Sequence, residues 1–373
     1  MDDDRAHMRH ALALARRGLG RTWPNPAVGC VIVQDGRIVG RGWTQPGGRP
    51  HAETMALAQA GAAARDATAY VTLEPCAHHG RTPPCADALV AAGVARVVVA
   101  LGDPDPRVDG QGIARLRAAG IAVDTGICAA EAREAQEGFL RRVTQGRPML
   151  TLKLALSWDG RIATATGESQ WITGPEARRR VHAMRADHDA VLIGAGTARA
   201  DDPGLTVRGL GIAHQPVRVV MSRRLDLPRD GQLARSAREV PLWLLHGPSV
   251  AADLREAWRD LGAELIEAPV ICGQLDPAAS LAALGARGLT RVFCEGGGTL
   301  AASLLGAGLA DRVALFTAGL AIGAEGMPGL GALGLDRLAQ APRYSLARIE
   351  RLGPDVLTLW RSASSGEAEP PRP

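Results

Sequence analysis

Residues 28–43, VGCVIVQDGRIVGRGW, contain two apolar runs that meet at Asp35-Gly36. Asp-Gly between two such runs predicts a β-hairpin with a two-residue turn. The sequence around it predicts helices over residues 5–19, 51–64 and 85–92 and strands over 69–74 and 96–101. Helices and strands keep alternating to about residue 145, and this order is typical of a three-layer α/β sandwich.

A second α/β region follows a stretch of structure-breaking residues. Gln145-Gly146-Arg147-Pro148 has this composition and precedes a new apolar run over 149–156, so we place the domain boundary between residues 146 and 147. Strands are then expected near residues 189–194, 216–221, 241–246, 263–267, 290–294 and 311–317. The predicted organisation is a domain over 1–146, a domain over 147–361 and a disordered, polar, proline-rich tail over 362–373.

Composition excludes several classes of protein. At 373 residues the chain is too long for one typical domain, and its 46% hydrophobic and 22% charged residues suit a globular protein with a sizeable core. A net charge of +4, with both signs scattered, does not indicate a nucleic-acid surface. No apolar run reaches the roughly 18 residues of a membrane span, and no signal peptide is visible. With six cysteines in so long a chain, we expect a soluble cytoplasmic protein with free or metal-bound thiols.

Potential zinc ligands have the pattern of zinc-dependent nucleobase deaminases. His51-Ala52-Glu53 is followed by Pro75-Cys76 and by Cys85. One imidazole and two thiolates favour zinc and leave a fourth tetrahedral position for water, whose pKa the metal lowers to about 7. Glu53 would carry a proton from that water to a leaving amine. We also expect Cys76 to begin a helix, whose dipole favours a thiolate.

Plainer interpretations and other functions remain open at this point. The cysteines can be buried core residues, or a zinc ion can be purely structural, with His78 or His79 as its fourth ligand. A nucleic-acid substrate, as in tRNA adenosine deaminases, is a second functional hypothesis. The eight residues between Cys76 and Cys85 and the absence of a basic stripe argue against it. A non-enzymatic, zinc-stabilised binding protein is a third.

A glycine-rich turn marks the second half of the chain. Glu295-Gly296-Gly297-Gly298-Thr299 directly follows the apolar run 292–294 and precedes an expected helix. Glycines at a strand-to-helix junction let a phosphate approach backbone N–H groups, although a ligand-free turn can have the same composition. Neither half has G-x-G-x-x-G after its first strand, so a Rossmann-type nicotinamide site is not supported.

The long spacing between the two cysteines reveals a family resemblance. Residues 74–85, EPCAHHGRTPPC, resemble the deaminase half of the bifunctional riboflavin-biosynthesis deaminase/reductases, as do residues 25–29 and 50–53. The second half resembles the reductase domain of the same family over residues 153–163, 167–173, 194–197, 200–208 and 295–298. The resemblance implies an N-terminal three-layer αβα cytidine-deaminase-like domain followed by a dihydrofolate-reductase-like α/β domain.

The resemblance also implies the residues of two sites. The zinc ligands would be His51, Cys76 and Cys85, and the catalytic proton shuttle would be Glu53. The deaminase substrate contacts would be Asn25, His78, Arg81 and Asp103. NADPH would contact Ala155, Trp171, Thr197, Asp201, Gly297, Gly298 and Thr299. The reductase substrate contacts would be Lys153, Ser169, Arg185, Leu205, Arg208 and Glu295, and the two arginines are suited to clamping a phosphate.

The implied activity is a pair of successive reactions with one zinc ion and NADPH as cofactors. The zinc site would hydrolyse the 2-amino group of a diamino-ribosylaminopyrimidinone 5′-phosphate, and the second domain would reduce the ribosyl group to ribityl. The expected partners are this small phosphorylated pyrimidine and further copies of the chain in a homo-oligomer, with neither nucleic acid nor membrane.

Three places depart from the usual family pattern. Asp105 stands where asparagine is usual, with Arg107 added nearby, and Trp158 replaces a leucine. Met221-Ser222-Arg223 replaces a usual Leu-Asp-Ser. The contacts of the loop around Asp105 and a cofactor contact near residues 222–223 are therefore open.

Overall fold

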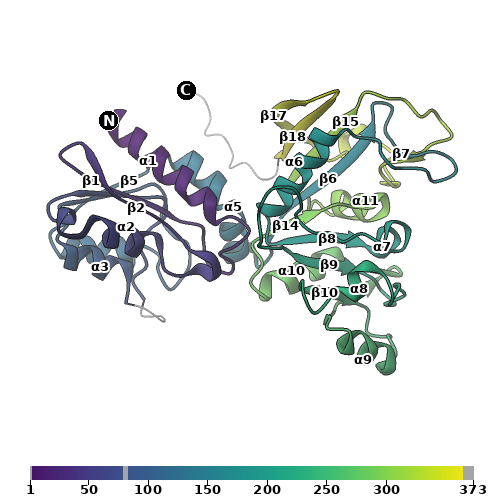
Figure 1. Ribbon diagram of the computed structural model, residues 1–373, viewed down its shortest axis with the longest axis horizontal. Helices are drawn as coiled ribbons and strands as arrows, with labels where there is room; N and C mark the ends of the chain where they lie inside the picture. The colour runs from purple at the N-terminus through teal and green to yellow at the C-terminus, as the bar shows by residue number, and fades with distance from the viewer. Residues whose placement is uncertain (1, 79–82, 364–373) are drawn as a thin grey trace. The chain divides into compact units, whose positions relative to one another are not determined.

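The computed structural model describes residues 2–78 and 83–363, which form two compact α/β units (Figure 1). One unit contains the chain up to Arg147 together with Arg287–Thr290, and the other contains Pro148–Ala286 and the chain from Arg291 onward. The boundary predicted between residues 146 and 147 lies one residue before this division. Of the tail predicted to be disordered, Ser362 instead ends a strand, and residues 364–373 lie outside the described residues.

The first unit alternates helices with the strands of one sheet. Its helices are α1 (Asp2–Ala15), α2 (Ala52–Ala60), α3 (Cys85–Ala92), α4 (Gln111–Ala118) and α5 (Ala129–Gln145). Its strands are β1 (Gly29–Gln34), β2 (Arg37–Trp43), β3 (Thr68–Val71), β4 (Arg96–Val99) and β5 (Ala122–Thr125). The strand order is β2-β1-β3-β4-β5. Strand β1 is antiparallel to both neighbours, and β3, β4 and β5 are parallel.

Alternating side chains of β1 face two different cores. Cys30 and Ile32 pack in a cluster with residues of α2 and α3, whereas Val31 and Val33 pack in a cluster with residues of α1. Because successive side chains of a strand point to opposite faces, helices must cover both faces of the sheet. The predicted three-layer arrangement is confirmed.

The hairpin predicted at Asp35-Gly36 has the expected turn. Gln34 pairs with Arg37 across it, and Asp35 and Gly36 have φ values of 49° and 72°. Positive φ at both central residues is typical of a type I′ turn, whose twist matches that of the flanking strands.

Glycines in β2 let α2 approach the sheet closely. A Cβ atom at Gly42 would overlap the carbonyl oxygen of Ala52, and one at Gly40 would overlap the carbonyl oxygen of Ala56. Helix α2 starts directly after His51. The two glycines therefore fix the depth at which the start of α2 lies against the sheet.

The second unit is built on a nine-stranded sheet. The strands of this sheet are β6 (Met149–Ser157), β8 (Ala190–Gly194), β9 (Val217–Met221), β10 (Leu242–His246), β11 (Glu264–Glu267), β14 (Arg291–Cys294), β15 (Arg312–Ala318), β17 (Tyr344–Leu352) and β18 (Asp355–Ser362). Two separate pairs are formed by β7 (Arg161–Ala163) with β16 (Met327–Pro328) and by β12 (Val270–Ile271) with β13 (Gln274–Leu275). Its helices are α6 (Pro175–Ala186), α7 (Ala195–Asp201), α8 (Gln232–Arg235), α9 (Ala252–Asp260), α10 (Pro277–Ala286) and α11 (Gly298–Gly306).

The order of this sheet places the glycine-rich turn near its middle. The order is β11-β10-β9-β8-β14-β6-β15-β18-β17, and every pair from β11 to β15 is parallel. Figure 1 shows β14, β8, β9 and β10 side by side in that order. Each strand predicted in the second half forms, within a residue or two of its expected bounds. The carboxyl ends of β14, β8 and β9 consequently share one edge of the sheet.

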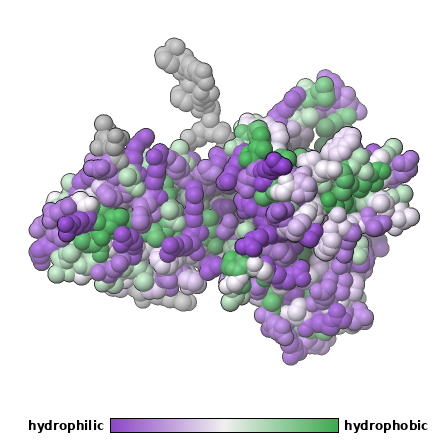
Figure 2. All heavy atoms as spheres, turned by 45° about the horizontal axis from the view of Figure 1, so that its top comes forward, coloured by the Kyte–Doolittle hydropathy of each residue, from purple (hydrophilic) through white to green (hydrophobic). Residues whose placement is uncertain are grey.

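Hydrophilic residues cover most of the face shown in Figure 2, and hydrophobic residues gather there in separate patches. Two indoles are nevertheless exposed, with 66% of Trp158 and 67% of Trp171 accessible. The tryptophan that replaces the usual family leucine thus faces solvent. Within the described ranges, no helix has the length and apolar character needed to cross a bilayer.

We expect Gly42→Ala to destabilise the first unit by about 1–3 kcal/mol, because the added methyl group overlaps the backbone of α2. Gly102→Ala is the control in the same unit, since its Cβ would meet only a Glu74 carboxylate oxygen, at 3.8 Å. Denaturant titration followed by circular dichroism measures both. A Gly42→Ala protein that unfolds at the wild-type denaturant concentration would contradict the close packing of α2.

Candidate active sites

Three metal-binding side chains meet at the starts of two helices in the first unit. His51 immediately precedes α2, Cys85 is the first residue of α3, and Cys76 lies in the loop after β3. His51 Nδ1 lies 3.2 Å from Cys85 Sγ and 3.6 Å from Cys76 Sγ, and the three donor atoms all lie within 4.8 Å of one another. Tetrahedral zinc would separate nitrogen and sulfur ligands by roughly 3.5 Å. The chemistry and spacing of this donor set fit a zinc ion.

The prediction that Cys76 begins a helix is wrong. Cys76 lies outside any helix, and the next helix of the described residues starts at Cys85, directly after Pro84, whose ψ of 143° is extended. A proline also disfavours the helical conformation in the residue before it. Cys76 nevertheless contacts the start of α3, because the backbone N–H of Cys85 donates a hydrogen bond to Cys76 Sγ at 3.3 Å. Hydrogen bonds from the Cys85 thiol and from His51 lower the pKa of Cys76 to about 4. Cys76 is therefore a ready thiolate ligand.

Glu53 is a buried carboxyl group beside these ligands. It lies in the first turn of α2 and is only 3% exposed. Burial raises the pKa of Glu53 to about 7, and the charge of Cys76 adds to this rise, whereas the positive charge of a zinc ion would oppose it. A carboxyl group that titrates near neutral pH can both accept and donate a proton.

Three of the four predicted deaminase substrate contacts, Asn25, His78 and Asp103, lie in described loops of the first unit. The half-buried His78 has its Nδ1 buried without a hydrogen-bond partner in the described structure, so this atom is suited to a ligand. Asn25 precedes β1, and its side chain lies against Gly48. Arg81 lies outside the described residues.

Sequence reasoning missed the role of Glu74, a buried residue two positions before Cys76. Its Oε2 accepts hydrogen bonds from the N–H groups of Asp103 and Gly110, and its Oε1 from those of Gly112 and Ile113. One carboxylate therefore organises the loop that carries Asp103. Burial raises the pKa of Asp103 to about 6. The only signal in the sequence was an acidic residue at the end of an apolar strand.

Asp105 and Arg107, the two residues that depart from the family pattern in this loop, form an ion pair with each other. Asp105 is buried, and Arg107 Nε and Nη2 donate to its two oxygens at 2.8 and 2.5 Å. This pairing lowers the pKa of Asp105. The added arginine thus supplies the positive charge that a buried aspartate requires, and the Asp105 N–H still donates to Asp103 Oδ1 at 2.9 Å.

A cavity of about 1180 Å³ lies in the second unit, at the carboxyl edge of its sheet. Every reductase residue expected from the sequence lines it: Lys153, Ala155, Ser169, Trp171, Arg185, Thr197, Asp201, Leu205, Arg208, Glu295, Gly297, Gly298 and Thr299. The Arg178 guanidinium lies 4.6 Å from the centre of the exposed Trp171 ring. A cavity of this size can hold a dinucleotide beside a small substrate.

The glycine-rich turn forms part of the cavity wall. It joins β14 to α11, as predicted, and Gly296 has a φ of 93° that favours glycine. A Cβ atom at Gly297 would lie 3.0 Å from Thr197 Oγ1, and one at Gly298 would lie 3.3 Å from the carbonyl oxygen of Gly329. Glycine at these two positions lets the turn pack closely against its neighbours, and the turn still lines the cavity, which fits a cofactor that carries phosphates.

Arg185, which was expected to help clamp a phosphate, is already paired with other groups of the chain. Its Nε and Nη2 donate to the two carboxylate oxygens of Glu295 at 2.5 and 3.0 Å, and its Nη1 donates to the carbonyl oxygen of Thr206 at 2.8 Å. Burial would raise the pKa of Glu295, but Arg185 outweighs it, so that the pKa is lowered. Arg185 therefore connects the end of β14 to the segment 205–208.

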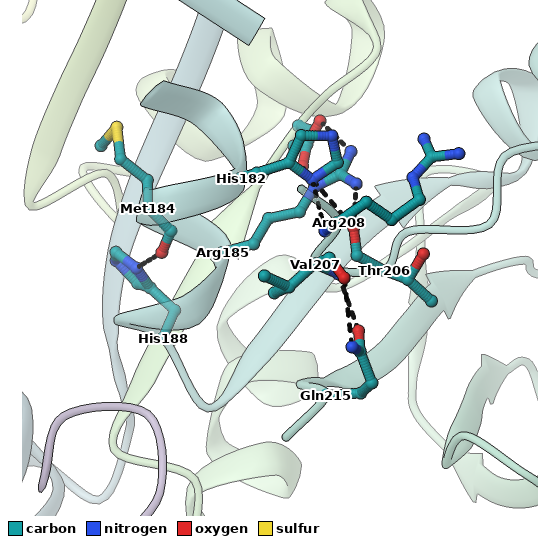
Figure 3. Close-up of polar contacts among 9 residues, drawn as sticks. His182, Met184, Arg185, His188, Thr206, Val207, Arg208 and Gln215 are labelled. Carbon is teal, nitrogen blue, oxygen red and sulfur yellow. Dashed lines mark hydrogen bonds and ion pairs between the residues drawn. The ribbon is translucent and has the colours of Figure 1, made fainter. Parts of the chain in front are cut away.

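His182 and Gln215, which sequence reasoning also missed, hold the same segment (Figure 3). His182 Nδ1 lies 3.1 Å from the Thr206 carbonyl oxygen and 3.3 Å from the backbone nitrogen of Arg208. The Gln215 amide bonds both the N–H and the carbonyl group of Val207, at 2.7 and 3.1 Å. The guanidinium of Arg208 itself has no partner among the described residues and is exposed at the cavity. The segment is thus fixed while its arginine remains available.

Lys153 lies half-buried on β6 among charged groups. Burial lowers its pKa, while the charge of Glu295 opposes this effect. Burial also raises the pKa of Asp201, and Lys153 opposes that rise. Lys153, Asp201 and Glu295 all line the cavity, where their charged groups can bind hydroxyl groups.

Two family models together match most of the chain. The model described as "RibD C-terminal domain" matches residues 148–358, and the one described as "Cytidine and deoxycytidylate deaminase zinc-binding region" matches residues 1–101. The riboflavin biosynthesis protein RibD of Escherichia coli (strain K12) is 44% identical over 366 residues, which cover 95% of this chain and 98% of the relative. The corresponding protein of Aquifex aeolicus (strain VF5) is 40% identical over 358 residues, which cover 96% and 98%.

Solved structures show the same similarity. Acinetobacter baumannii RibD, form 1, has 40% identity and a TM-score of 0.87, covering 97% of this chain and 99% of its own. The diaminohydroxyphosphoribosylaminopyrimidine deaminase/5-amino-6-(5-phosphoribosylamino)uracil reductase of Thermotoga maritima has 34% identity and a TM-score of 0.85, with the same coverage. Zinc and NADPH are the cofactors of the two activities. The chain belongs to the RibD family of bifunctional riboflavin-biosynthesis enzymes, which deaminate a pyrimidine and then reduce its ribosyl group.

Proposed function

We propose that residues 1–146 remove the 2-amino group of the diamino-ribosylaminopyrimidinone 5′-phosphate and that residues 147–361 then reduce its ribosyl group to ribityl. One observation carries this assignment of roles. The first unit holds a His/Cys/Cys donor set beside a buried carboxyl group, and the second holds a large cavity lined by all the reductase residues expected from the sequence. The two chemistries thus have their own sites in different units.

In the deaminase site, the residues of the chain hold the metal and move protons. His51, Cys76 and Cys85 would hold a zinc ion, which would supply a water molecule activated for attack at neutral pH. Glu53 accepts a proton from the attacking water and donates one to the amino group, which leaves as ammonia. The unpartnered Nδ1 of His78 supports a contact between this residue and the substrate, and we assign Asn25, Arg81 and Asp103 to the same substrate by family resemblance.

In the reductase site, the residues of the chain align two bound molecules. NADPH supplies the hydride. Arg208 binds the 5′-phosphate with its free guanidinium, and Lys153 and Asp201 hydrogen-bond the ribosyl hydroxyl groups. Glu295 acts through Arg185, which fixes the segment that carries Arg208.

The remaining cavity residues divide between the two molecules. We assign the cofactor to Ala155, Trp171, Thr197, Asp201, Gly297, Gly298 and Thr299, and the substrate to Ser169 and Leu205, so that Asp201 contacts both molecules. The glycine-rich backbone supports the cofactor assignment, since it offers N–H groups to phosphates at the start of α11.

We also assign a homo-oligomeric state and a cytoplasmic location to the enzyme. Strand β17 is an edge of the nine-stranded sheet, and Leu346 and Ile349 on it are exposed. An exposed edge with apolar side chains favours pairing with another copy of the chain. The thiols of Cys76 and Cys85 must stay reduced to bind zinc, which suits a reducing compartment.

Glu53→Gln should lower the rate of ammonia release at least about 100-fold, because glutamine keeps the volume of the side chain but cannot carry a proton. NADPH oxidation with the deaminated intermediate should stay unchanged, as should the zinc content. Glu131→Gln, the same change at a more exposed position of this unit, is the control. Ammonia release by Glu53→Gln at the rate of Glu131→Gln would remove Glu53 from the mechanism.

Removing zinc with a chelator should abolish ammonia release and leave the first unit folded, because its sheet is buried between helices without help from the metal. Parallel assays of ammonia, NADPH oxidation and circular dichroism test this expectation, with zinc added back as the control. If chelation unfolds the unit, the metal is structural and the chain fits a zinc-stabilised binding protein instead.

Arg208→Ala should raise the KM for the phosphorylated intermediate by about 10- to 100-fold, which corresponds to the binding free energy of one or two charge-assisted hydrogen bonds. Arg208→Lys should retain part of the affinity, because it keeps the charge but not the planar guanidinium. Steady-state kinetics with the dephosphorylated intermediate provide the control. An equal loss with both substrates would show that Arg208 does not bind the phosphate.

A further inference from the structure

A segment that has no role in the function proposed above joins three neighbouring strands of the second unit. Residues 319–331 follow β15 and end at Gly331, whose N–H donates to the Gly298 carbonyl oxygen at 3.0 Å, at the start of α11. Strands β15, β6 and β14 are parallel and adjacent in that order, and α11 is the helix that follows β14. We call residues 319–331 the strap, because they connect the end of β15 to the start of α11 past the end of β6.

Asp159 binds the strap beside the end of β6. It lies in the short turn between β6 and β7, and the Ser157 hydroxyl donates to its Oδ1 at 2.5 Å. Its Oδ2 accepts hydrogen bonds from the backbone N–H groups of Ile322 at 3.2 Å and of Gly323 at 2.7 Å. The hydrogen bond from Ser157 and those from the strap lower the pKa of Asp159 to about 2. The carboxylate is therefore ionised at neutral pH, and an ionised acceptor forms stronger hydrogen bonds than a neutral one.

Beyond these contacts the strap forms part of the cavity wall. Met327 of β16 pairs with Ala163 of β7, and the Gly329 N–H donates to the Gly160 carbonyl oxygen at 3.0 Å. Met327, Ala163 and Gly329 all line the cavity, whereas Asp159 does not. Asp159 is therefore placed to influence the cavity through the strap and not by contact with a bound molecule.

The last residues of the strap pack against the backbone at the start of α11. A Cβ atom at Gly331 would lie 3.2 Å from the carbonyl oxygen of Gly298 and 3.4 Å from Thr299 Cα. A Cβ atom at Gly298 would in turn lie 3.3 Å from the carbonyl oxygen of Gly329. The function proposed above assigns the phosphates of the cofactor to this helix start. A displaced strap would therefore displace backbone N–H groups on which the cofactor depends.

The attachment of the strap at Asp159 differs from its other attachments. Within the described ranges, the remaining hydrogen bonds from the strap to other segments join backbone groups, as between the Trp158 N–H and the Leu320 carbonyl oxygen at 3.0 Å. At Asp159, a side chain holds the strap instead. The segment 205–208, which carries Arg208, is fixed by residues of other elements. A change at Asp159 should therefore affect the cofactor and leave binding of the substrate phosphate intact.

We propose that Asp159 is a positioning residue of the reductase, which orders the start of α11 for the cofactor by holding the strap beside the end of β6. The proposal rests on the proposed function, in which the start of α11 binds the phosphates of NADPH. Without the carboxylate, the N–H groups of Ile322 and Gly323 lose their acceptor in the described structure, and the strap samples other conformations. The cofactor then binds only the fraction of the enzyme in which the helix start is ordered, so its apparent Kd rises by the inverse of that fraction.

Calorimetric titration of the full chain with NADPH tests the proposal without relying on activity. Asp159→Ala should weaken binding about 10-fold, which corresponds to an ordered fraction of about one tenth. Asp159→Asn should weaken it about 3-fold, because an amide oxygen still accepts both hydrogen bonds but carries no charge. Glu325→Ala is the matched control and should bind NADPH as the wild type does, since Glu325 is an exposed acidic residue of the strap itself.

Kinetics and hydrogen exchange separate a positioning role from a general loss of stability. In Asp159→Ala, the KM for NADPH should rise about 10-fold while kcat and the KM for the phosphorylated intermediate stay within about 2-fold of the wild type. Exchange of backbone amides, followed by mass spectrometry without nucleotide, should become faster in the strap and in the first turn of α11. Exchange should keep its wild-type rate in the segment 205–208 and in β9.

NADPH binding at the wild-type affinity in both Asp159 variants would overturn the proposal. An equal loss of affinity for NADPH and for the intermediate, with faster exchange throughout the second unit, would also overturn it, because Asp159 would then only stabilise the fold. If Asp159→Ala does not fold, Asp159→Asn decides between these outcomes by the same measurements. A wild-type chain that binds no NADPH would defeat the proposed function together with this inference, whereas normal binding by the variants would defeat the inference alone.

Discussion

Both sites depend on one constraint of parallel α/β sheets, namely that functional groups gather where strands end and helices begin. His51 and Cys85 stand at the starts of α2 and α3, and the glycine-rich turn stands between β14 and α11. Helix starts offer unpaired N–H groups and a positive dipole end. A helix start therefore donates a hydrogen bond to the Cys76 sulfur in the first unit, and a helix start in the second unit is suited to binding phosphate groups.

Buried carboxylates arrange the loops around these helix starts. Glu74 binds four backbone N–H groups of the loop that carries Asp103. Glu295 holds Arg185, which in turn holds the carbonyl group of Thr206. In each case, hydrogen bonds from residues distant in the sequence compensate the free-energy cost of burying the carboxylate charge. Removal of either carboxylate would leave buried donors without partners.

Local chemistry could be predicted from the sequence, and distant pairing could not. The turn at Asp35-Gly36, the αβα layers and the three zinc donors follow from residue types and short spacings. Arg185 was expected to clamp a phosphate, and its pairing with Glu295 could not be foreseen, because the two residues are 110 positions apart in the sequence. The helix expected at Cys76 does not form, since the prolines of the following loop delay the helix to Cys85. In the sequence, Asp105 and Arg107 look like two separate departures from the family pattern. In the structure they form one ion pair.

The central claim is that two units of one chain act on the same molecule in a fixed order. Mass spectrometry of the products formed from the diamino-ribosylaminopyrimidinone phosphate, with and without NADPH, tests it most directly. Without NADPH, the deaminated ribosyl compound should accumulate together with one equivalent of ammonia. With NADPH, the deaminated ribityl compound should replace it. A ribityl product that retains the 2-amino group would contradict the order, and substrate recovered unchanged from the zinc-loaded enzyme would contradict the account as a whole.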